Sequence, residues 1–144
     1  MTTPAKIHPA NSITREVVYA LIEASRAAAK EIGIETTIAI VDVGGHLKAF
    51  ERSDKALFLT AGVAVDKAWT AASFGLPTHT WARIISDSQV AQLAHQPRLV
   101  AVGGGYPIVV DSQVVGGLGI SGGNALQDQQ ACEAALRGLG FEIN

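Results

Sequence analysis

Lys67 is the residue with the clearest chemical potential in this sequence, because it is a cation in an otherwise apolar stretch. Between Ala56 and Gly75 only Asp66 and Lys67 are charged. A helix that is apolar nearly all round is buried on several sides, and a buried ammonium is costly unless it is paired. We therefore expect Lys67 to form a structural ion pair, to act as a ligand contact or catalytic amine, or to extend its ammonium to solvent.

The carboxylate that would pair with Lys67 must come from another part of the chain. Asp66 lies about 100° away around the same helix and is a poor partner. Asp42 and Asp54 stand at the ends of expected strands and are better candidates. The sequence therefore predicts that one of these two carboxylates meets Lys67.

A glycine-rich hairpin in the last third of the chain contains a second candidate site. Gly117-Leu-Gly119-Ile-Ser-Gly122 matches G-x-G-x-x-G between a strand and a helix. A dinucleotide site needs this motif in a βαβ unit, and no further strand is expected after the helix, so we expect no such site. Backbone N–H groups around Gly122 and Gly123 either receive an anionic ligand group, or the glycines only allow a close approach of the strand to its neighbours.

The histidines and the single cysteine give weaker signals. The four histidines show no helical i, i+3 or i, i+4 pair and no Cys/His pattern, so no zinc site is expected. His8 and His46 are either axial haem ligands or ordinary surface histidines. Cys132 lies in an Ala-rich helical stretch and is expected to be a buried small hydrophobe and not a nucleophile. Trp69 and Trp81 are expected in the core or in subunit contacts and not in a cofactor box.

Composition limits the class of protein. A chain of 144 residues fits one domain. Only 17% of its residues are charged, against about 25% in typical globular proteins, which favours a homo-oligomer, with an Ala-rich core as the alternative. The net charge of −2 and the scattered cations exclude a nucleic-acid partner. The absence of a signal-like or membrane-length apolar run predicts a cytoplasmic protein with no membrane partner.

Periodicity and turn signals predict an α+β fold with a largely antiparallel five-stranded sheet and helices packed on it. Asn11 and Ser12 are the expected caps of the first helix. The expected helices cover residues up to 32, 55–75, 78–93 and 125–139, and the expected strands cover 36–42, 46–52, 98–102, 106–110 and 113–120.

Several of these segments resemble the GlcG/HbpS family. They are Ile38-Ala-Ile-Val-Asp-Val-Gly-Gly-His-Leu-Lys-Ala-Phe-Glu-Arg-Ser-Asp54, Asp66-Lys-Ala68, Leu76-Pro-Thr78, Gly103-Gly-Gly-Tyr-Pro-Ile108 and Val115-Gly-Gly-Leu-Gly-Ile-Ser-Gly-Gly123, with Asp128. The resemblance covers about residues 12–139 in the family's order. It implies one profilin-like domain over residues 1–144, with 1–11 as a loose N-terminal segment, and assembly into homo-oligomers.

The resemblance also implies a pocket. Its expected lining, carried over by position, is Asp42, Arg52, Asp54, Lys67, Thr78, Gly104, Gly105, Gly122 and Gly123. The family's usual Arg-x-Asp-Gly-Ala is Arg52-Ser-Asp54-Lys55-Ala56 here, which places a cation at the pocket lip. The Glu-x-x-Glu pair linked to iron binding in HbpS is absent from the sequence.

Two functions follow as alternatives. The first is a small-ligand-binding protein that takes haem or a related tetrapyrrole, because the family includes the haem-binding HbpS proteins and the C-terminal domain of PduO-type proteins. Lys55 or Lys67 would then meet the propionates, and His8 or His46 would lie near the iron.

The second function is an enzyme that acts on a small carboxylate by proton transfer, tautomerisation, hydration or hydrolysis. Lys67 would be its acid or base and Asp54 would orient Lys67. Arg52 or the helix N-terminus at Gly122 and Gly123 would anchor the substrate carboxylate.

Overall fold

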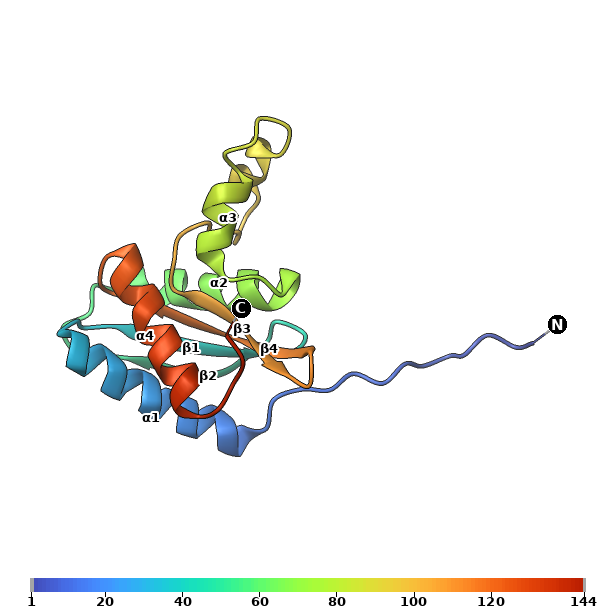
Figure 1. Cartoon of the computed structure of the whole chain (residues 1–144), viewed down its shortest axis with the longest axis horizontal. Helices are drawn as coiled ribbons and strands as arrows, with labels where there is room; N and C mark the ends of the chain where they lie inside the picture. Colours follow the sequence, from blue (N-terminus) through green and yellow to red (C-terminus); the bar gives the residue numbers. More distant parts are fainter. Residues whose placement is uncertain (1, 144) are drawn as a thin grey trace.

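The computed structural model describes residues 2–143, and its helices and strands follow the order expected from the sequence with two exceptions. The elements are α1 (Arg15–Ile32), β1 (Thr37–Asp42), β2 (Leu47–Arg52), α2 (Leu59–Phe74), α3 (Thr78–Ile84), the 3-10 helix η1 (Ala91–His95), β3 (Gly105–Val110), β4 (Gln113–Ser121) and α4 (Ala125–Gly138) (Figure 1). None of the helices in this part of the chain is long and apolar enough to cross a bilayer.

Local capping sets the ends of the outer helices. The hydroxyl of Thr14 accepts from the N–H of Val17 and caps α1, so the predicted caps Asn11 and Ser12 are wrong. The reason is that the N–H of Ile13 donates to the carbonyl of Val115, which holds the preceding residues against β4. At α4 the side chain of Asn124 accepts from the N–H of Gln127, whose own side chain caps Asn124 in return.

The sheet has the order β2-β1-β4-β3, and every neighbouring pair is antiparallel. This confirms the α+β class with an antiparallel sheet, but the prediction of five strands is wrong because this sheet has four. The expected strand at 98–102 runs beside α2 instead. Its Arg98 has a left-handed φ of 72°, and the N–H of Val100 donates to the hydroxyl of Thr70 and not to a neighbouring strand.

The helix predicted for 78–93 is also shorter than expected. It ends at Ile84, and a 3-10 helix follows from Ala91. Polar side chains between the two bond to nearby backbone: the hydroxyl of Ser86 donates to the carbonyl of Arg83, and the carboxylate of Asp87 accepts from the N–H of Gln89. Such local bonds compete with helix propagation.

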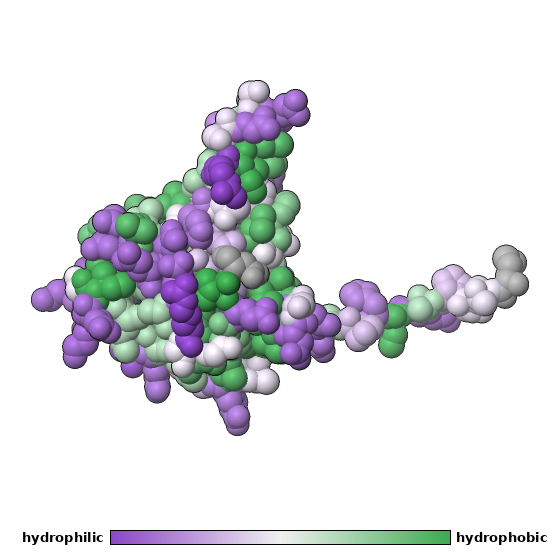
Figure 2. Space-filling view, in the orientation of Figure 1, coloured by the Kyte–Doolittle hydropathy of each residue, from purple (hydrophilic) through white to green (hydrophobic). Residues whose placement is uncertain are grey.

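The elements form three layers. α1 and α4 lie side by side on one face of the sheet, and α2 covers the other face (Figure 1). β1 serves both layers, since Ile38 and Ile40 join the main core beneath α1 and α4 whereas Val41 packs on α2. α3 and the segment after it project from the body, and Figure 2 shows apolar residues along one edge of this projection. Residues 2–12 are exposed and run out as an extended segment (Figure 1).

Glycines bring the backbone of α2 into direct contact with the sheet. A Cβ added at Gly119 would lie 2.0 Å from the carbonyl oxygen of Ala64, and one at Gly117 would lie 2.2 Å from that of Ala68. Both distances are below any real contact, so no other residue fits there without moving the helix. The first two glycines of G-x-G-x-x-G therefore permit a close approach of strand and helix.

We expect Gly119→Ala to lower the free energy of unfolding by at least about 1–3 kcal/mol, because the added methyl overpacks the α2 contact. Urea denaturation measures this change. Gly62→Ala is the matched control, since Gly62 lies exposed on the same helix with no heavy atom within 4 Å of an added Cβ. It should raise stability by about 0.5–1 kcal/mol through helix propensity. Equal stability of Gly119→Ala and the parent would contradict the close approach.

Candidate functional site

Lys67 lies at the centre of a buried polar cluster. It projects from α2, is 2% exposed, and its Nζ lies 3.0 Å from Oδ2 of Asp128 and 3.0 Å from the carbonyl oxygen of Ile120. In this structure Lys67 therefore forms a structural ion pair, the first of the three expected states. The predicted partners Asp42 and Asp54 are wrong, because the tertiary fold supplies a carboxylate 61 residues away in sequence.

Asp128 also satisfies the two glycine N–H groups at the start of α4. Its Oδ1 accepts from the N–H of Gly123 at 2.8 Å, and its Oδ2 lies 3.4 Å from the N–H of Gly122. A carboxylate near a helix N-terminus is favoured by the unpaired N–H groups there. The place expected for an anionic ligand group is thus taken by the carboxylate of Asp128 in the first turn of α4.

Gly104 packs directly against the ammonium of Lys67. Its φ is +117°, and a Cβ there would lie 2.7 Å from the ammonium of Lys67 and 2.5 Å from the carbonyl oxygen of Ile120. The carbonyl of Gly104 accepts from the thiol of Cys132 at 3.2 Å. Burial raises the pKa of this thiol far above its usual range, so Cys132 is a buried neutral thiol, as predicted from its helical context.

Thr78 links α3 to the same region. Its hydroxyl accepts from the N–H of Gly105 at 2.8 Å and donates to the carbonyl of Val102 at 2.6 Å. The structure thus brings together six of the predicted pocket residues, which are Lys67, Thr78, Gly104, Gly105, Gly122 and Gly123. They form a packed, hydrogen-bonded cluster and not an open cavity.

Arg52 and Asp54 lie at the end of β2, on the surface. The guanidinium of Arg52 donates to the carbonyl of Ala56 at 2.8 Å. Arg52, Asp54 and Lys55 line one shallow hollow. Arg52 also borders a second hollow of about 510 Å³, whose other lining residues are Ala56, Leu57, Phe58 and Leu59.

The second hollow is lined by large apolar side chains that stand in solvent. Leu57, Phe58 and Leu59 are 72%, 89% and 70% exposed. Phe50 on β2 is also exposed. It pairs with Ala39 of β1, which lies on the same face of the strand as Val41, the face that α2 covers. Exposed apolar patches are typical of interaction or ligand-binding surfaces. The sequence pattern Ala56-Leu-Phe-Leu59 predicts the start of a buried helix, and this prediction is wrong for the three large side chains.

Asp42 and His46 lie at the opposite end of β2. The Oδ1 of Asp42 accepts from the N–H groups of Gly44 and His46 at 2.9 and 3.0 Å, and lies 3.4 Å from Nδ1 of His46. Partial burial by itself raises the pKa of Asp42, but these N–H groups and the imidazole outweigh it and lower the pKa overall. The His46 side chain is 83% exposed, and its Nδ1 faces the carboxylate.

His46 immediately precedes β2 and Arg52 is the last of its six residues, so about 20 Å of strand separates the two. His8 lies in the extended segment outside the body, with Nδ1 3.3 Å from the carbonyl oxygen of Pro9. The candidate haem ligands of one chain are thus separate from the apolar surface beside Arg52.

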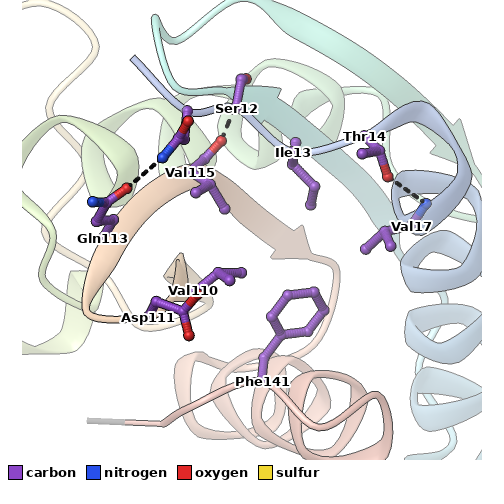
Figure 3. A pocket seen from close by; sticks show the side chains of 10 residues that line it. Ser12, Ile13, Thr14, Val17, Val110, Asp111, Gln113, Val115 and Phe141 are labelled. Atoms are coloured by element: carbon purple, nitrogen blue, oxygen red, sulfur yellow. Dashed lines mark hydrogen bonds between the residues drawn. The ribbon is translucent and has the colours of Figure 1, made fainter. Parts of the chain in front are cut away.

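A further pocket of about 440 Å³ lies where the start of α1 meets the β3–β4 hairpin and the C-terminal segment. Figure 3 shows Phe141 and Val110 at this pocket opposite Ile13 and Val115. The side-chain amide of Asn11 donates to Gln113 at 2.7 Å. None of the nine residues that the family resemblance places at a ligand pocket is among the residues that line this one.

The fold and the cluster define a class of α+β proteins in which a helix lies on a glycine-rich antiparallel sheet and a buried lysine reaches the opposite helical layer. The model of the family described as "Haem degrading protein HbpS-like" matches residues 13–137. The chain belongs to this HbpS-like family, which confirms the resemblance inferred from its motifs.

The relatives and solved structures agree with this assignment. The chain is 32% identical over 109 residues to Protein GlcG of Escherichia coli strain K12, covering 76% of this chain and 81% of GlcG. It is 31% identical over 140 residues to the corrinoid adenosyltransferase PduO of Citrobacter freundii, covering 95% of this chain but only 42% of PduO.

Two solved structures show the same fold. One is a PduOC:heme complex, with a TM-score of 0.82 and 27% identity, covering 91% of this chain and 97% of that one. The other is a double mutant of HbpS from Streptomyces reticuli, with a TM-score of 0.87 and 26% identity, covering 97% and 95%.

We expect Lys67→Met to cost about 3–5 kcal/mol of unfolding free energy, because it leaves the buried carboxylate of Asp128 without its cation. Lys6→Met, at an exposed position in the N-terminal segment, is the matched control and should leave stability unchanged. Chemical denaturation followed by circular dichroism measures both. A loss below about 1 kcal/mol in Lys67→Met would show that the pair contributes little.

Proposed function

We propose that this chain is a small-ligand-binding protein that holds haem or a related tetrapyrrole against the surface at the start of α2. The observation that carries the proposal is the run of exposed side chains Leu57, Phe58 and Leu59 beside the cation Arg52. A tetrapyrrole presents a wide apolar ring and carboxylates at its edge. It therefore needs an apolar surface bordered by positive charge, which this hollow offers.

The first turn of α2 supports the same ligand chemistry. Within the described residues α2 has no side-chain cap at Phe58 and no acidic residue in its first turn. The N–H groups of Thr60 and Ala61 donate to the backbone carbonyls of Leu57 and Phe58, so what this end of α2 offers a ligand carboxylate is the positive end of the helix dipole with no acidic side chain against it. Lys55, which departs from the family's usual glycine, adds an exposed cation next to Arg52.

The ligand to the iron comes, in this proposal, from a second copy of the chain. His46 is separated from Arg52 by the length of β2, so one chain does not present both to one tetrapyrrole. Asp42 lies 3.4 Å from Nδ1 of His46, and a carboxylate on one ring nitrogen makes the other a better ligand. His46 or His8 of a neighbouring copy would approach the ring in a homo-oligomer. Bound haem would supply the iron chemistry, and the chain's own residues would hold the ring and its carboxylates.

The buried cluster is less suited to a small carboxylate substrate. The ammonium of Lys67 and the N–H groups of Gly122 and Gly123 are occupied by Asp128. A substrate carboxylate at this place would have to displace that side chain. We therefore place the ligand at the exposed surface and not at Lys67.

Hemin titration followed by the Soret band tests the proposal. Phe58→Ala should weaken hemin binding about ten-fold or more, since it removes the largest apolar contact, and Arg52→Met should weaken it through loss of the cation. Leu126→Ala, which removes another exposed apolar side chain, on α4, is the control and should bind as the parent does. His46→Ala or His8→Ala should shift the Soret maximum.

The binding surface and the histidine ligands can each be contradicted separately. Weak hemin binding that is indifferent to Phe58→Ala and Arg52→Met would reject the surface at the start of α2. Strong binding with an unchanged Soret spectrum in both histidine variants would keep the surface but reject His8 and His46 as ligands.

A further inference from the structure

A small aromatic hollow lies at the other end of α2, between α2, α3 and η1. Its volume is about 210 Å³, and its apolar lining residues are Trp69, Phe74, Trp81, Leu93 and Leu99. Phe74 and Trp81 pack edge to face, with ring centroids 4.5 Å apart. Trp69, the first α2 residue of its lining, follows Leu59 by ten residues, so about 15 Å of helix separates this hollow from Leu57–Leu59.

The indole N–H of Trp81 has no hydrogen-bond partner among the described residues. Trp81 is 2% exposed, and its Nε1 is one of three buried side-chain nitrogen or oxygen atoms without a partner in this part of the chain. A buried tryptophan usually finds an acceptor for this N–H, because an unpaired buried donor costs free energy. The hollow is thus lined by a residue whose buried donor has no acceptor among the described residues.

The wall of the hollow is firmly attached to α2. Arg98 lies between the lining residues Gln96 and Leu99, and its guanidinium stacks 4.5 Å from the ring centroid of Trp69 and bonds to Asp66 at 2.9 Å. Its carbonyl accepts from the hydroxyl of Thr70 at 2.9 Å. Arg98 has a left-handed φ of 72°, and such a conformation in a residue other than glycine persists where surrounding contacts hold it.

The lining also limits the charge of an occupant. The remaining lining residues are Thr70, Ser73 and Gln96, so no ionisable side chain faces the hollow. Its volume exceeds that of an engineered apolar cavity of about 150 Å³ that binds benzene. The volume is also below the range of about 300–1,000 Å³ typical of sites for drug-sized ligands.

From these observations we infer that the hollow is a second binding site, for a small, flat, uncharged molecule with one hydrogen-bond acceptor. The ring of the ligand packs between Trp69, Trp81 and Phe74. Its acceptor, a carbonyl or hydroxyl oxygen, takes the hydrogen bond of the Trp81 indole. The site is independent of the proposed tetrapyrrole surface and is too small for a tetrapyrrole.

Two probes of the same shape test the site, acetophenone and α-methylstyrene, in which a methylene group replaces the carbonyl oxygen. The chain contains only two tryptophans, and both line the hollow. The ¹⁵N-labelled protein therefore has two indole N–H signals, and Trp81→Phe identifies that of Trp81 by its loss. Acetophenone should shift the Trp81 signal downfield in a saturable way, whereas α-methylstyrene should not.

Variants separate the hydrogen bond from the apolar contact. Trp81→Phe keeps an aromatic ring against Phe74, and it should weaken acetophenone about five-fold, as expected for one net hydrogen bond, with α-methylstyrene unchanged. Leu93→Ala shortens a partly exposed wall residue and should weaken both probes equally. Because Leu93→Ala leaves Trp81 in place, it keeps the test informative if Trp81→Phe does not fold.

Three results would overturn the inference. The first is no saturable shift of either indole signal up to millimolar probe. The second is equal affinity for both probes in the parent and in Trp81→Phe, which would show that the N–H does not meet the ligand. The third is a shift that follows protein concentration and not probe concentration, which would show that a second copy covers the hollow.

Discussion

The ion pair between Lys67 and Asp128 is the interaction on which the arrangement of the layers depends. α2 and α4 lie on opposite faces of the sheet, and this pair is the polar link between them at the end of β4. Removing one partner would leave a buried charge, which is far more costly than the net gain of an exposed pair. A Cβ at Gly104 would collide with the side chains of both Lys67 and Asp128, so this position must lack a side chain. The ion pair between Lys67 and Asp128 thus positions both the backbone at Gly104, before β3, and the turn at Gly122 and Gly123, before α4.

The position of α2 explains where the binding surfaces lie. Its inner side lies on the glycines of β4, so the helix sits unusually close to the sheet and its small residues fill the narrow space. Its two ends extend past this contact and carry large apolar residues that one chain leaves uncovered. Leu57–Leu59 stand in solvent at the first end, and Trp69 and Phe74 border the aromatic hollow at the second. A helix that is apolar all round buries one side within its own chain and presents the rest to ligands or to another copy.

Much of the fold was predictable from local patterns. The β-branched run before Asp42 and the glycine-rich strand before Ser121 became β1 and β4, and the alanine-rich stretches became α2 and α4. The wrong predictions fall in segments where tertiary contacts outweigh the local sequence pattern. Residues 98–102 have strand-like composition, but Thr70 and Trp69 hold them against α2. Lys67 and the paired glycines, predicted to line one pocket, meet in a packed cluster, whereas Asp42 and Arg52 lie at opposite ends of the β1–β2 hairpin.

The sequence by itself determined the types of most elements, a largely antiparallel sheet, and that the ammonium of Lys67 must meet a partner or solvent. These follow from periodicity, from turn chemistry and from the cost of burying a charge, which are properties of short segments. Only the tertiary structure decided that the partner is Asp128, since two residues 61 positions apart meet only when both helical layers close over the sheet. It also decided that Gly117 and Gly119 serve helix packing, because only the path of α2 shows what a side chain there would contact.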